Sequence, residues 1–137
     1  MSKVKGSRAE RELFHMLWNE GHAVVRSAGS GSTTKPAPDL LTSNGFKTMA
    51  IECKSIKGKK KYFDHTEILQ LNLFANTFGA EAWLGLRFDN VGWFFIESKH
   101  IVKSKGESLL LTLDYMRKKG LTFDELIGKY EQKKLNL

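Results

Sequence analysis

The sequence predicts one α/β domain spanning residues 1–137, with a mixed central β-sheet flanked by helices. Three observations lead to this prediction. Segments with helical spacing of apolar residues alternate with short apolar segments typical of strands. An Asn-Gly dipeptide joins two segments of alternating polarity. No internal repeat or long linker divides the chain, and its 41% hydrophobic residues can fill a core.

The first predicted element is a helix of about four turns. Residues 7–10, Ser-Arg-Ala-Glu, have the spacing of a capping box, and apolar residues follow at helical spacing up to Gly21. Residues 23–26 predict a short strand. Residues 28–34 are small and rich in glycine and serine, so we expect a mobile loop there.

A hairpin follows, with predicted strands at 39–42 and 47–54 around the turn segment 43–46. Asn-Gly at 44–45 favours a tight turn with positive φ. Met49, Ile51 and Cys53 would share one face of the second strand, and Glu52 and Lys54 would lie on the other. If the turn centres on residues 44–45, Asp39 lies opposite Ala50. Glu52 is then its diagonal neighbour on the same face, roughly 7–8 Å away.

The second half of the chain predicts two more helices and two more strands. Residues 57–61 predict a lysine-rich loop, and the capping box at 64–67 begins a helix that ends at Gly79. Strands are predicted at 82–88 and 93–96. A third capping box at 122–125 begins a last helix through residues 126–130. Between them, residues 109–113 have the composition of a strand, and the rest of 99–120 has no clear pattern.

The distribution of charge indicates a polyanionic partner. The chain holds 22 Lys and Arg against 15 Asp and Glu, a net charge of +7. The whole excess lies in residues 1–61, which hold 12 basic and 5 acidic residues, whereas residues 62–137 hold 10 of each. Phosphate binding requires such a concentration of positive charge. The alternative is that the lysines at 57–61 only make a surface loop soluble.

Several classes of site are excluded by composition and spacing. A single cysteine, Cys53, cannot form an intramolecular disulfide or a cysteine-only zinc site, and the four histidines have no paired ligand spacing. No P-loop or dinucleotide fingerprint is present, so we expect no organic cofactor. The N-terminal residues lack an apolar run, so we expect no membrane segment, no signal peptide and a cytoplasmic protein.

Three acidic residues stand out as candidates for chemistry. Glu10 belongs to the apolar stripe of the first helix, although it could simply complete the capping box with Ser7. Asp39 and Glu52 come from adjacent strands and can converge on one hard cation, since Mg²⁺ takes about one or two carboxylates plus waters and phosphate oxygens. Lys54, on the same face, could hold a water or offset phosphate charge. The alternative is a surface cluster in which Lys54 only neutralises Glu52.

These residues, and the segments around them, match a known pattern. Glu10, Asp39 and the run Glu52-Cys53-Lys54 resemble the Glu…Asp…Glu-x-Lys core of the restriction-endonuclease-like nuclease superfamily. A narrower resemblance, covering about residues 3–97, is to the archaeal-type Holliday junction resolvases. The segments that carry this resemblance are 5–13, 23–30, 38–39, 51–54 and 90–97.

The resemblance implies a homodimer that cuts four-way DNA junctions by paired symmetric nicks, with Mg²⁺ or Mn²⁺. Carried over by position, Asp39 and Glu52 would ligate the metal with help from the Cys53 backbone carbonyl, and Glu10 would complete the acidic site. Lys54 would position the attacking water or stabilise charge. Ser30 matches a serine implicated in activity in part of the family. At Glu67 some relatives carry glutamine or an apolar residue, and no role is assigned to it.

The candidates for phosphate contacts are basic residues of the first half of the chain. They are Lys3, Lys5, Arg8, Arg11, Arg26, Lys35, Lys57, Lys59, Lys60 and Lys61. Two alternatives stay open at this point. One is another small nuclease of the same superfamily that prefers a different form of DNA. The other is a basic DNA-binding protein whose carboxylates are structural.

Overall fold

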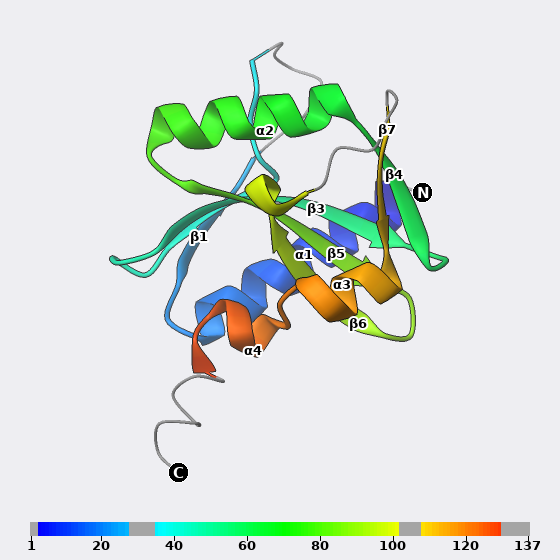
Figure 1. Cartoon of the computed structure of the whole chain (residues 1–137). Coiled ribbons are helices and arrows are strands. Elements are labelled where there is room, and N and C mark those ends of the chain that lie inside the picture. Colours follow the sequence, from blue (N-terminus) through cyan, green and yellow to red (C-terminus); the bar gives the residue numbers. More distant parts are fainter. Residues whose placement is uncertain (1–2, 28–34, 102–107, 130–137) are drawn as a thin grey trace.

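A five-stranded sheet forms the centre of the protein, in the order β1-β2-β3-β5-β6 (Figure 1). The computed structural model describes residues 3–27, 35–101 and 108–129. β3 and β5 are parallel, and every other neighbouring pair is antiparallel, so the sheet is mixed as predicted. Its strands are β1 (Ala23–Arg26), β2 (Leu40–Ser43), β3 (Thr48–Ile56), β5 (Glu81–Phe88) and β6 (Gly92–Glu97).

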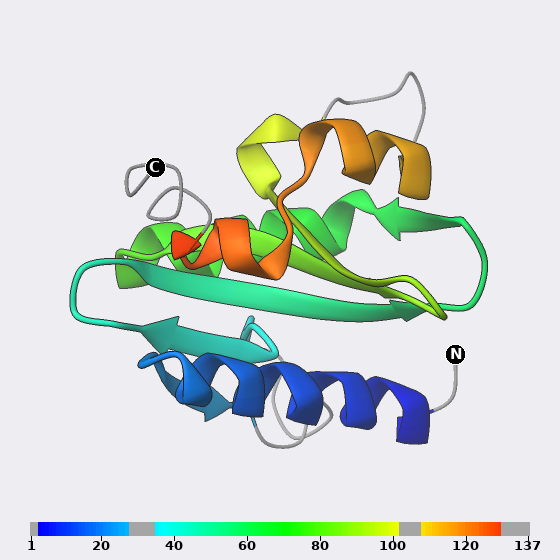
Figure 2. The same ribbon diagram turned by 90° about the horizontal axis from the view of Figure 1, so that it is seen from below.

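Helices cover both faces of this sheet, and each face has its own core. α1 (Lys3–Asn19) packs on one face, where Leu13 and Leu17 are fully buried against Ile51, and the short α4 (Phe123–Leu126) adds Leu126. In Figure 2, α1 runs alongside the long strand β3. α2 (His65–Phe78) and α3 (Leu113–Lys119) contribute to the core on the other face. Consequently β3, in the middle of the sheet, is covered on both sides.

A separate two-stranded ribbon joins the first half of the chain to its C-terminal third. β4 (Lys60–Asp64) pairs antiparallel with β7 (Ser108–Thr112). The prediction of a loop through residues 60 and 61 was therefore wrong, because Phe63 is buried in the core and draws its segment into a strand. The strand expected at 109–113 exists, but Leu113 already begins α3. A 3₁₀ turn, η1 (Ser98–His100), follows β6.

Two of the three predicted capping boxes are confirmed. The Asp64 side chain accepts from Thr66 N–H, Glu67 reaches back to the Asp64 N–H, and Gly79 ends α2 with φ +90°. The Thr122–Glu125 box begins α4, which is shorter than expected; Tyr130 lies outside the described residues. The Ser7 box was wrong, because α1 begins at Lys3 and Ser7 lies inside the helix.

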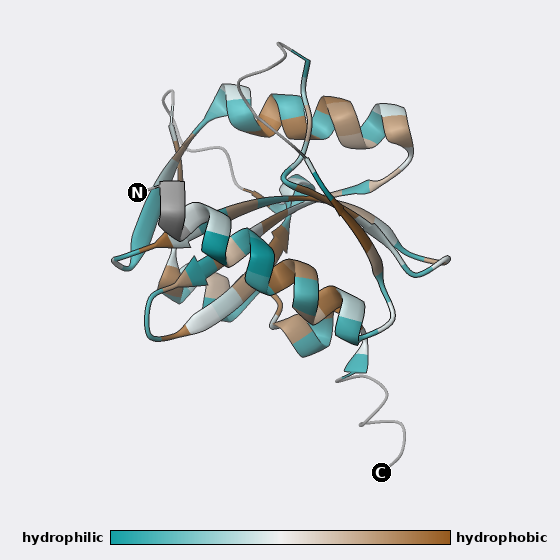
Figure 3. Ribbon diagram, turned by 180° about the vertical axis from the view of Figure 1, so that it is seen from behind, coloured by the Kyte–Doolittle hydropathy of each residue, from teal (hydrophilic) through white to brown (hydrophobic). Residues whose placement is uncertain are grey.

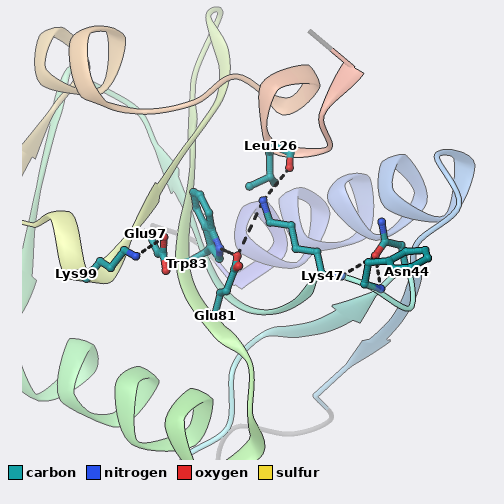
Figure 4. A network of polar contacts seen from close by, with 8 residues as sticks. Asn44, Lys47, Glu81, Trp83, Glu97, Lys99 and Leu126 are labelled. Atoms are coloured by element: carbon teal, nitrogen blue, oxygen red, sulfur yellow. Dashed lines mark hydrogen bonds and ion pairs between the residues drawn. The ribbon is translucent and has the colours of Figure 1, made fainter. Parts of the chain in front are cut away.

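The loop between β2 and β3 is fastened to the C-terminal part of the fold (Figure 4). Lys47 Nζ donates to the carbonyl of Leu126 at 3.1 Å and lies 5.1 Å from the centre of the Trp83 ring. Glu81 accepts from Trp83 Nε1 at 2.9 Å and faces Lys47 at 3.9 Å. These contacts hold the β2–β3 hairpin against β5 and α4. The position of the hairpin, which supplies two residues of the site described below, is therefore fixed.

Apolar residues concentrate in the central strands, and the outer turns are hydrophilic (Figure 3). The turn between β3 and β4, which holds Lys57 and Lys59, is among these hydrophilic turns. None of the helices in the described ranges has the length and apolar character needed to cross a membrane.

Candidate active site

Asp39 and Glu52 come to the same level of the β2–β3 hairpin. The observed register pairs Leu40 with Ile51 and Leu41 with Ala50. One step further along this register, Asp39 stands across from Glu52. The predicted register, with Asp39 opposite Ala50, was therefore wrong by two residues. Because that difference is even, both carboxylates keep the face that the sequence predicted.

The chemistry of the turn explains this difference. Asn44 N–H pairs with the Lys47 carbonyl, so the turn centres on residues 45 and 46 instead of 44 and 45. Gly45 takes the positive φ, +94°, at the first central position. The Asn44 side chain accepts from the N–H groups of Phe46 and Lys47 at 2.9 and 2.8 Å, which stabilises this centring.

Asp39 is held in place by the strands on both sides of it. Its Oδ2 accepts from the Cys53 backbone N–H at 2.8 Å. Its own carbonyl accepts from the Ser27 N–H at 3.0 Å, which continues the β1–β2 pairing. The Ser27 hydroxyl also donates to the carbonyl of Pro38. One oxygen of the Asp39 carboxylate is therefore bound to β3, and the Asp39 backbone is fixed by its hydrogen bond to Ser27.

Glu52 lies in an environment that disfavours its charge. Burial raises the pKa of Glu52, and the negative charge of Asp39 raises it further, to about 8. Lys54, on the same face of β3, acts in the opposite direction and lowers it. Two neighbouring carboxylates repel each other when both are ionised, and a bound cation would reduce this repulsion.

Glu10 approaches the same aspartate from α1. Burial raises the pKa of Glu10, as does the charge of Asp39, while Arg26 lowers it. Arg26 Nη2 lies 3.7 Å from Glu10 Oε2. Because Ser7 lies inside α1, the capping role considered for Glu10 is wrong, and its side chain is directed to Asp39 and Arg26 instead. Arg26, expected on the DNA-contacting surface, lies half-buried within the acidic site.

Lys54 is held by a residue to which the sequence assigned no role. Its Nζ donates to Glu67 Oε1 at 2.8 Å, and Glu67 is the third residue of α2. Burial alone would lower the pKa of Lys54, but its hydrogen bond to Glu67 and the charges of the surrounding carboxylates raise it. The capping box was visible in the sequence, yet it accounts for only one of the two Glu67 oxygens.

Cys53 contributes backbone and not thiol to this site. Its side chain is buried in the core that faces α1, and burial raises the pKa of the thiol well above its usual value. The Cys53 N–H is the donor to Asp39 described above. The role predicted for the Cys53 carbonyl, as a metal ligand, stays a prediction.

The arrangement of the acidic residues bears directly on metal binding. Asp39 interacts separately with Glu10 and with Glu52. Within the described ranges, however, no three His, Cys, Asp or Glu side chains form a group ready to enclose a metal ion. Mg²⁺ needs about one or two protein carboxylates, with waters and phosphate oxygens completing its octahedron. The Asp39–Glu52 pair fits that requirement, and Glu10 interacts with this pair through Asp39.

Other basic candidates gather at one end of the molecule. The N-terminal half of α1 and the β3–β4 turn lie on the same side in Figures 1 and 2. Arg8 and Arg11 are exposed on that helix, and Lys57, Lys59 and Lys60 are exposed in and beside the turn. Lys61 is half-buried and Lys35 is exposed. Ser30, the loop 28–34 and the side chains of Lys3 and Lys5 lie outside the description.

One further acidic residue has a structural role that spacing did not indicate. Glu12 Oε1 accepts from Arg87 Nε at 2.9 Å and from Trp93 Nε1 at 2.6 Å. Burial alone would raise the pKa of Glu12, but these two donors lower it. Although Glu12 is exposed, it fastens α1 to β5 and β6.

Comparison of the sequence with known proteins finds relatives named as crossover junction endodeoxyribonucleases. A family model described as archaeal Holliday junction resolvase (Hjc) matches residues 1–135. The crossover junction endodeoxyribonuclease Hjc of Archaeoglobus fulgidus is 36% identical over 132 residues, which cover 96% of each chain. The enzyme of the same name from Methanocaldococcus jannaschii is 30% identical, covering 96% of this chain and 93% of its own.

Solved structures extend this similarity to three dimensions. The structure of Archaeoglobus fulgidus Hjc, a Holliday junction resolvase, superimposes with a TM-score of 0.83 at 33% identity, covering 90% of this chain and 100% of that one. A bacterial homing endonuclease, I-Ssp6803I, has a TM-score of 0.54 at 14% identity over 99% of this chain and 98% of its own. The second similarity concerns the fold alone.

Proposed function

This chain belongs to the archaeal Holliday junction resolvase family, and we propose that it is a DNA endonuclease that resolves four-way junctions by paired symmetric nicks. One observation carries this proposal. Asp39, anchored on the Cys53 N–H, stands level with Glu52 and beside the Lys54 ammonium. Acidic ligands next to a fixed cation suit hydrolysis of a phosphodiester. We take residues 1–137 as one nuclease domain.

The cofactor in this proposal is Mg²⁺, with Mn²⁺ as a substitute. Asp39 and Glu52 would hold it with the Cys53 carbonyl, and Glu10 would support Asp39. When bound, the cation supplies Lewis-acid polarisation of a phosphoryl oxygen and lowers the pKa of water at the site. Its charge would also offset the repulsion that raises the pKa of Glu52.

Lys54 and Glu67 perform the remaining work at the phosphate. The Lys54 ammonium, fixed at 2.8 Å from Glu67, offsets negative charge that builds up on the phosphate oxygens during attack. Glu67 restricts the rotamers of Lys54, so less conformational freedom is lost when DNA binds. Arg26, paired with Glu10, adds a second positive charge behind Asp39.

The basic end of the molecule would hold the DNA arms. Within the described residues, Arg8, Arg11 and Lys57 have no carboxylate partner, whereas Arg26, Arg87 and Lys129 are each in an ion pair. Free cations are available to phosphates at no cost in broken ion pairs. Contacts of this kind position a duplex without reading its sequence, so recognition would depend on the shape of the junction.

We further propose that the protein acts as a homodimer through the outer side of α2. The inner side of α2 buries Ile68, Leu71 and Ala75, yet its outer side is also apolar. Leu69 and Leu73, one turn apart, are 65% and 58% exposed. A second copy would cover this side, and a two-fold dimer presents two active sites to the two equivalent strands of a junction.

The test is incubation of the protein and Mg²⁺ with an end-labelled four-way junction, with a linear duplex of the same sequence alongside. Products are read on a denaturing gel, and Mn²⁺ is tried in parallel. Symmetric nicks confined to the junction are the expected result. Equal cutting of both DNAs would instead indicate another nuclease of the superfamily. Binding of the junction without cutting under either metal would indicate a non-catalytic DNA-binding protein.

A further inference from the structure

A basic pocket lies away from the acidic site, where the β3–β4 turn meets the segment that leads from β7 into α3. It has a volume of about 420 Å³. Lys59 and Lys60 line it from the first of these segments and Val91 from the turn between β5 and β6. The segment that leads from β7 into α3 contributes Thr112, Leu113, Asp114 and Arg117. Arg117, on α3, therefore shares a pocket with two lysines from the other half of the chain.

Backbone hydrogen bonds hold the two walls of this pocket together. The Leu113 N–H donates to the Lys59 carbonyl at 2.8 Å. The next residue, Lys60, pairs with Thr112 at the end of the β4–β7 ribbon. The two backbone segments that carry these lining residues are consequently held side by side by the fold itself.

The charge of the pocket is unbalanced. Lys59, Lys60 and Arg117 stand against a single carboxylate, Asp114. Among described residues, neither Lys59 nor Arg117 makes an ion pair through its side chain, and Lys60 lies 5.8 Å from the centre of the Tyr62 ring. Three positive charges beside one negative charge leave a net repulsion. An anion in the pocket would remove this repulsion.

The pocket lies close enough to the acidic site for one DNA molecule to contact both. Lys59 follows Lys54 by five residues, which span no more than about 18 Å. Along duplex DNA each strand carries a phosphate every ~3.4 Å of helix axis. A duplex with one phosphodiester at Asp39 and Glu52 therefore has further phosphates within reach of this pocket, no more than about five base pairs away.

We propose that this pocket binds backbone phosphates of a junction arm and that Arg117 is its principal contact. The inference rests on the proposed junction-cutting function and deepens it, because it gives the C-terminal third of the chain a part in holding DNA. A guanidinium suits this role, since it can donate two parallel hydrogen bonds to one phosphate.

The experiment compares Arg117→Gln and Lys59→Gln with Lys118→Gln and Lys119→Gln. The control lysines lie on the same helix, are exposed and carry the same charge, but do not line the pocket. Binding of a four-way junction and of a linear duplex is measured by fluorescence anisotropy over a series of salt concentrations. Thermal unfolding checks that each variant is folded.

We expect Arg117→Gln and Lys59→Gln each to weaken binding to both DNAs and to reduce the log–log salt slope by about 0.9. The two control variants should retain the wild-type slope. Asp114→Asn, which removes the opposing charge, should strengthen binding.

The inference would be overturned if Arg117→Gln and Lys118→Gln had equal salt slopes of DNA binding. This holds if both slopes match that of the wild type, and also if both are reduced by the same amount. A pocket for free phosphate or a nucleotide would also leave DNA binding of Arg117→Gln unchanged, and so is covered by that outcome. A wild-type protein that neither prefers nor cuts junctions would instead refute the proposed function, so the two failures are distinguishable.

Discussion

Glu67 joins Lys54 to the first turn of α2 through two separate oxygens. Its Oε1 accepts from Lys54 Nζ at 2.8 Å, and its Oε2 accepts from the Asp64 backbone N–H at 3.3 Å. The same carboxylate therefore begins a helix and orients the lysine of the candidate active site. Any change that displaces the Glu67 carboxylate would also free Lys54.

The first prediction separates these two roles of Glu67. Glu67→Gln keeps an acceptor for Lys54 and should nick junctions within a few-fold of the wild type. Glu67→Ala removes that acceptor and should slow nicking by about tenfold, a typical loss when support behind an active-site group is removed. Asp64→Ala is the matched control, because it breaks only the cap and should cost about 0.5–2 kcal/mol of stability. Single-turnover rates at saturating protein would decide the matter, and equal rates for Glu67→Ala and Asp64→Ala would contradict it.

The second prediction concerns the paired carboxylates. Asp39→Asn or Glu52→Gln should reduce nicking by about 100-fold or more, because each removes a charged ligand from the proposed cation site. Junction binding in the absence of metal should survive in both variants, since neither residue lies on the basic end. Gel shifts and nicking assays on the same samples measure the two properties. A wild-type cutting rate in either variant would refute the proposed roles.

The third prediction follows from the raised pKa of Glu52. The pKa of the Glu52 carboxyl group is near 4.5 in the unfolded chain and about 8 in the folded protein. Between these values the folded state binds more protons, so the contribution of Glu52 to stability falls as pH rises through this window. Glu52→Gln should therefore stabilise the metal-free protein at pH 8.5 relative to pH 5, by on the order of 1–3 kcal/mol. Denaturant melts at the two pH values measure the difference. Equal stabilisation at both would mean that Glu52 ionises normally.

A related prediction links protons to the cation. Binding of Mg²⁺ by Glu52 requires its ionised form, so the apparent affinity for Mg²⁺ should rise with pH up to about 8. Glu52→Gln should abolish this dependence along with most of the affinity. Calorimetry in buffers of different ionisation enthalpy would count the protons released, and none released near neutral pH would contradict this expectation.

The fourth prediction tests the dimer. Replacing Leu69 and Leu73 with serine should produce monomers without loss of fold, because both side chains are exposed in one chain. Phe46→Ser is the control, since Phe46 is 97% exposed at the tip of the β2–β3 hairpin and is not part of α2. Sedimentation velocity measures the mass of each protein. A wild-type monomer, or a dimer that survives the double substitution, would argue against this surface.

Short-range patterns in the sequence predicted much of this fold correctly. The strand at 23–26 and the capping boxes at Asp64 and Thr122 depend on neighbouring residues, and the structure confirms them. The register of the hairpin could not be derived in the same way, because Asn44 uses its side chain to close the turn and not its own backbone conformation. The predicted turn centre at residues 44–45 and the observed centre at 45–46 both place Asp39 and Glu52 on one face. The sequence therefore predicted the acidic pair correctly despite the wrong register.

What the sequence could not predict depends on contacts between distant segments. β4 forms a strand by pairing with β7, where Lys60 lies opposite Thr112, 52 positions later in the sequence. The hydrogen bond between Glu67 and Lys54 likewise requires α2 to pack over β3. No local pattern encodes either approach, so a lysine-rich strand was taken for a loop and Glu67 for a capping residue alone.

The β2–β3 hairpin determines the order in which the candidate active site forms during folding. Asp39 and Glu52 are brought together by a turn of a few residues, a contact that closes quickly and at small entropic cost. Lys54 gains its partner only after α2 has formed and β5 has paired with β3, where Ile51 meets Trp83, 32 positions later in the sequence. The carboxylate pair should thus appear early and the lysine clamp late. In a refolding experiment, recovery of nicking should follow the slow phase of tryptophan burial and not the earlier formation of secondary structure.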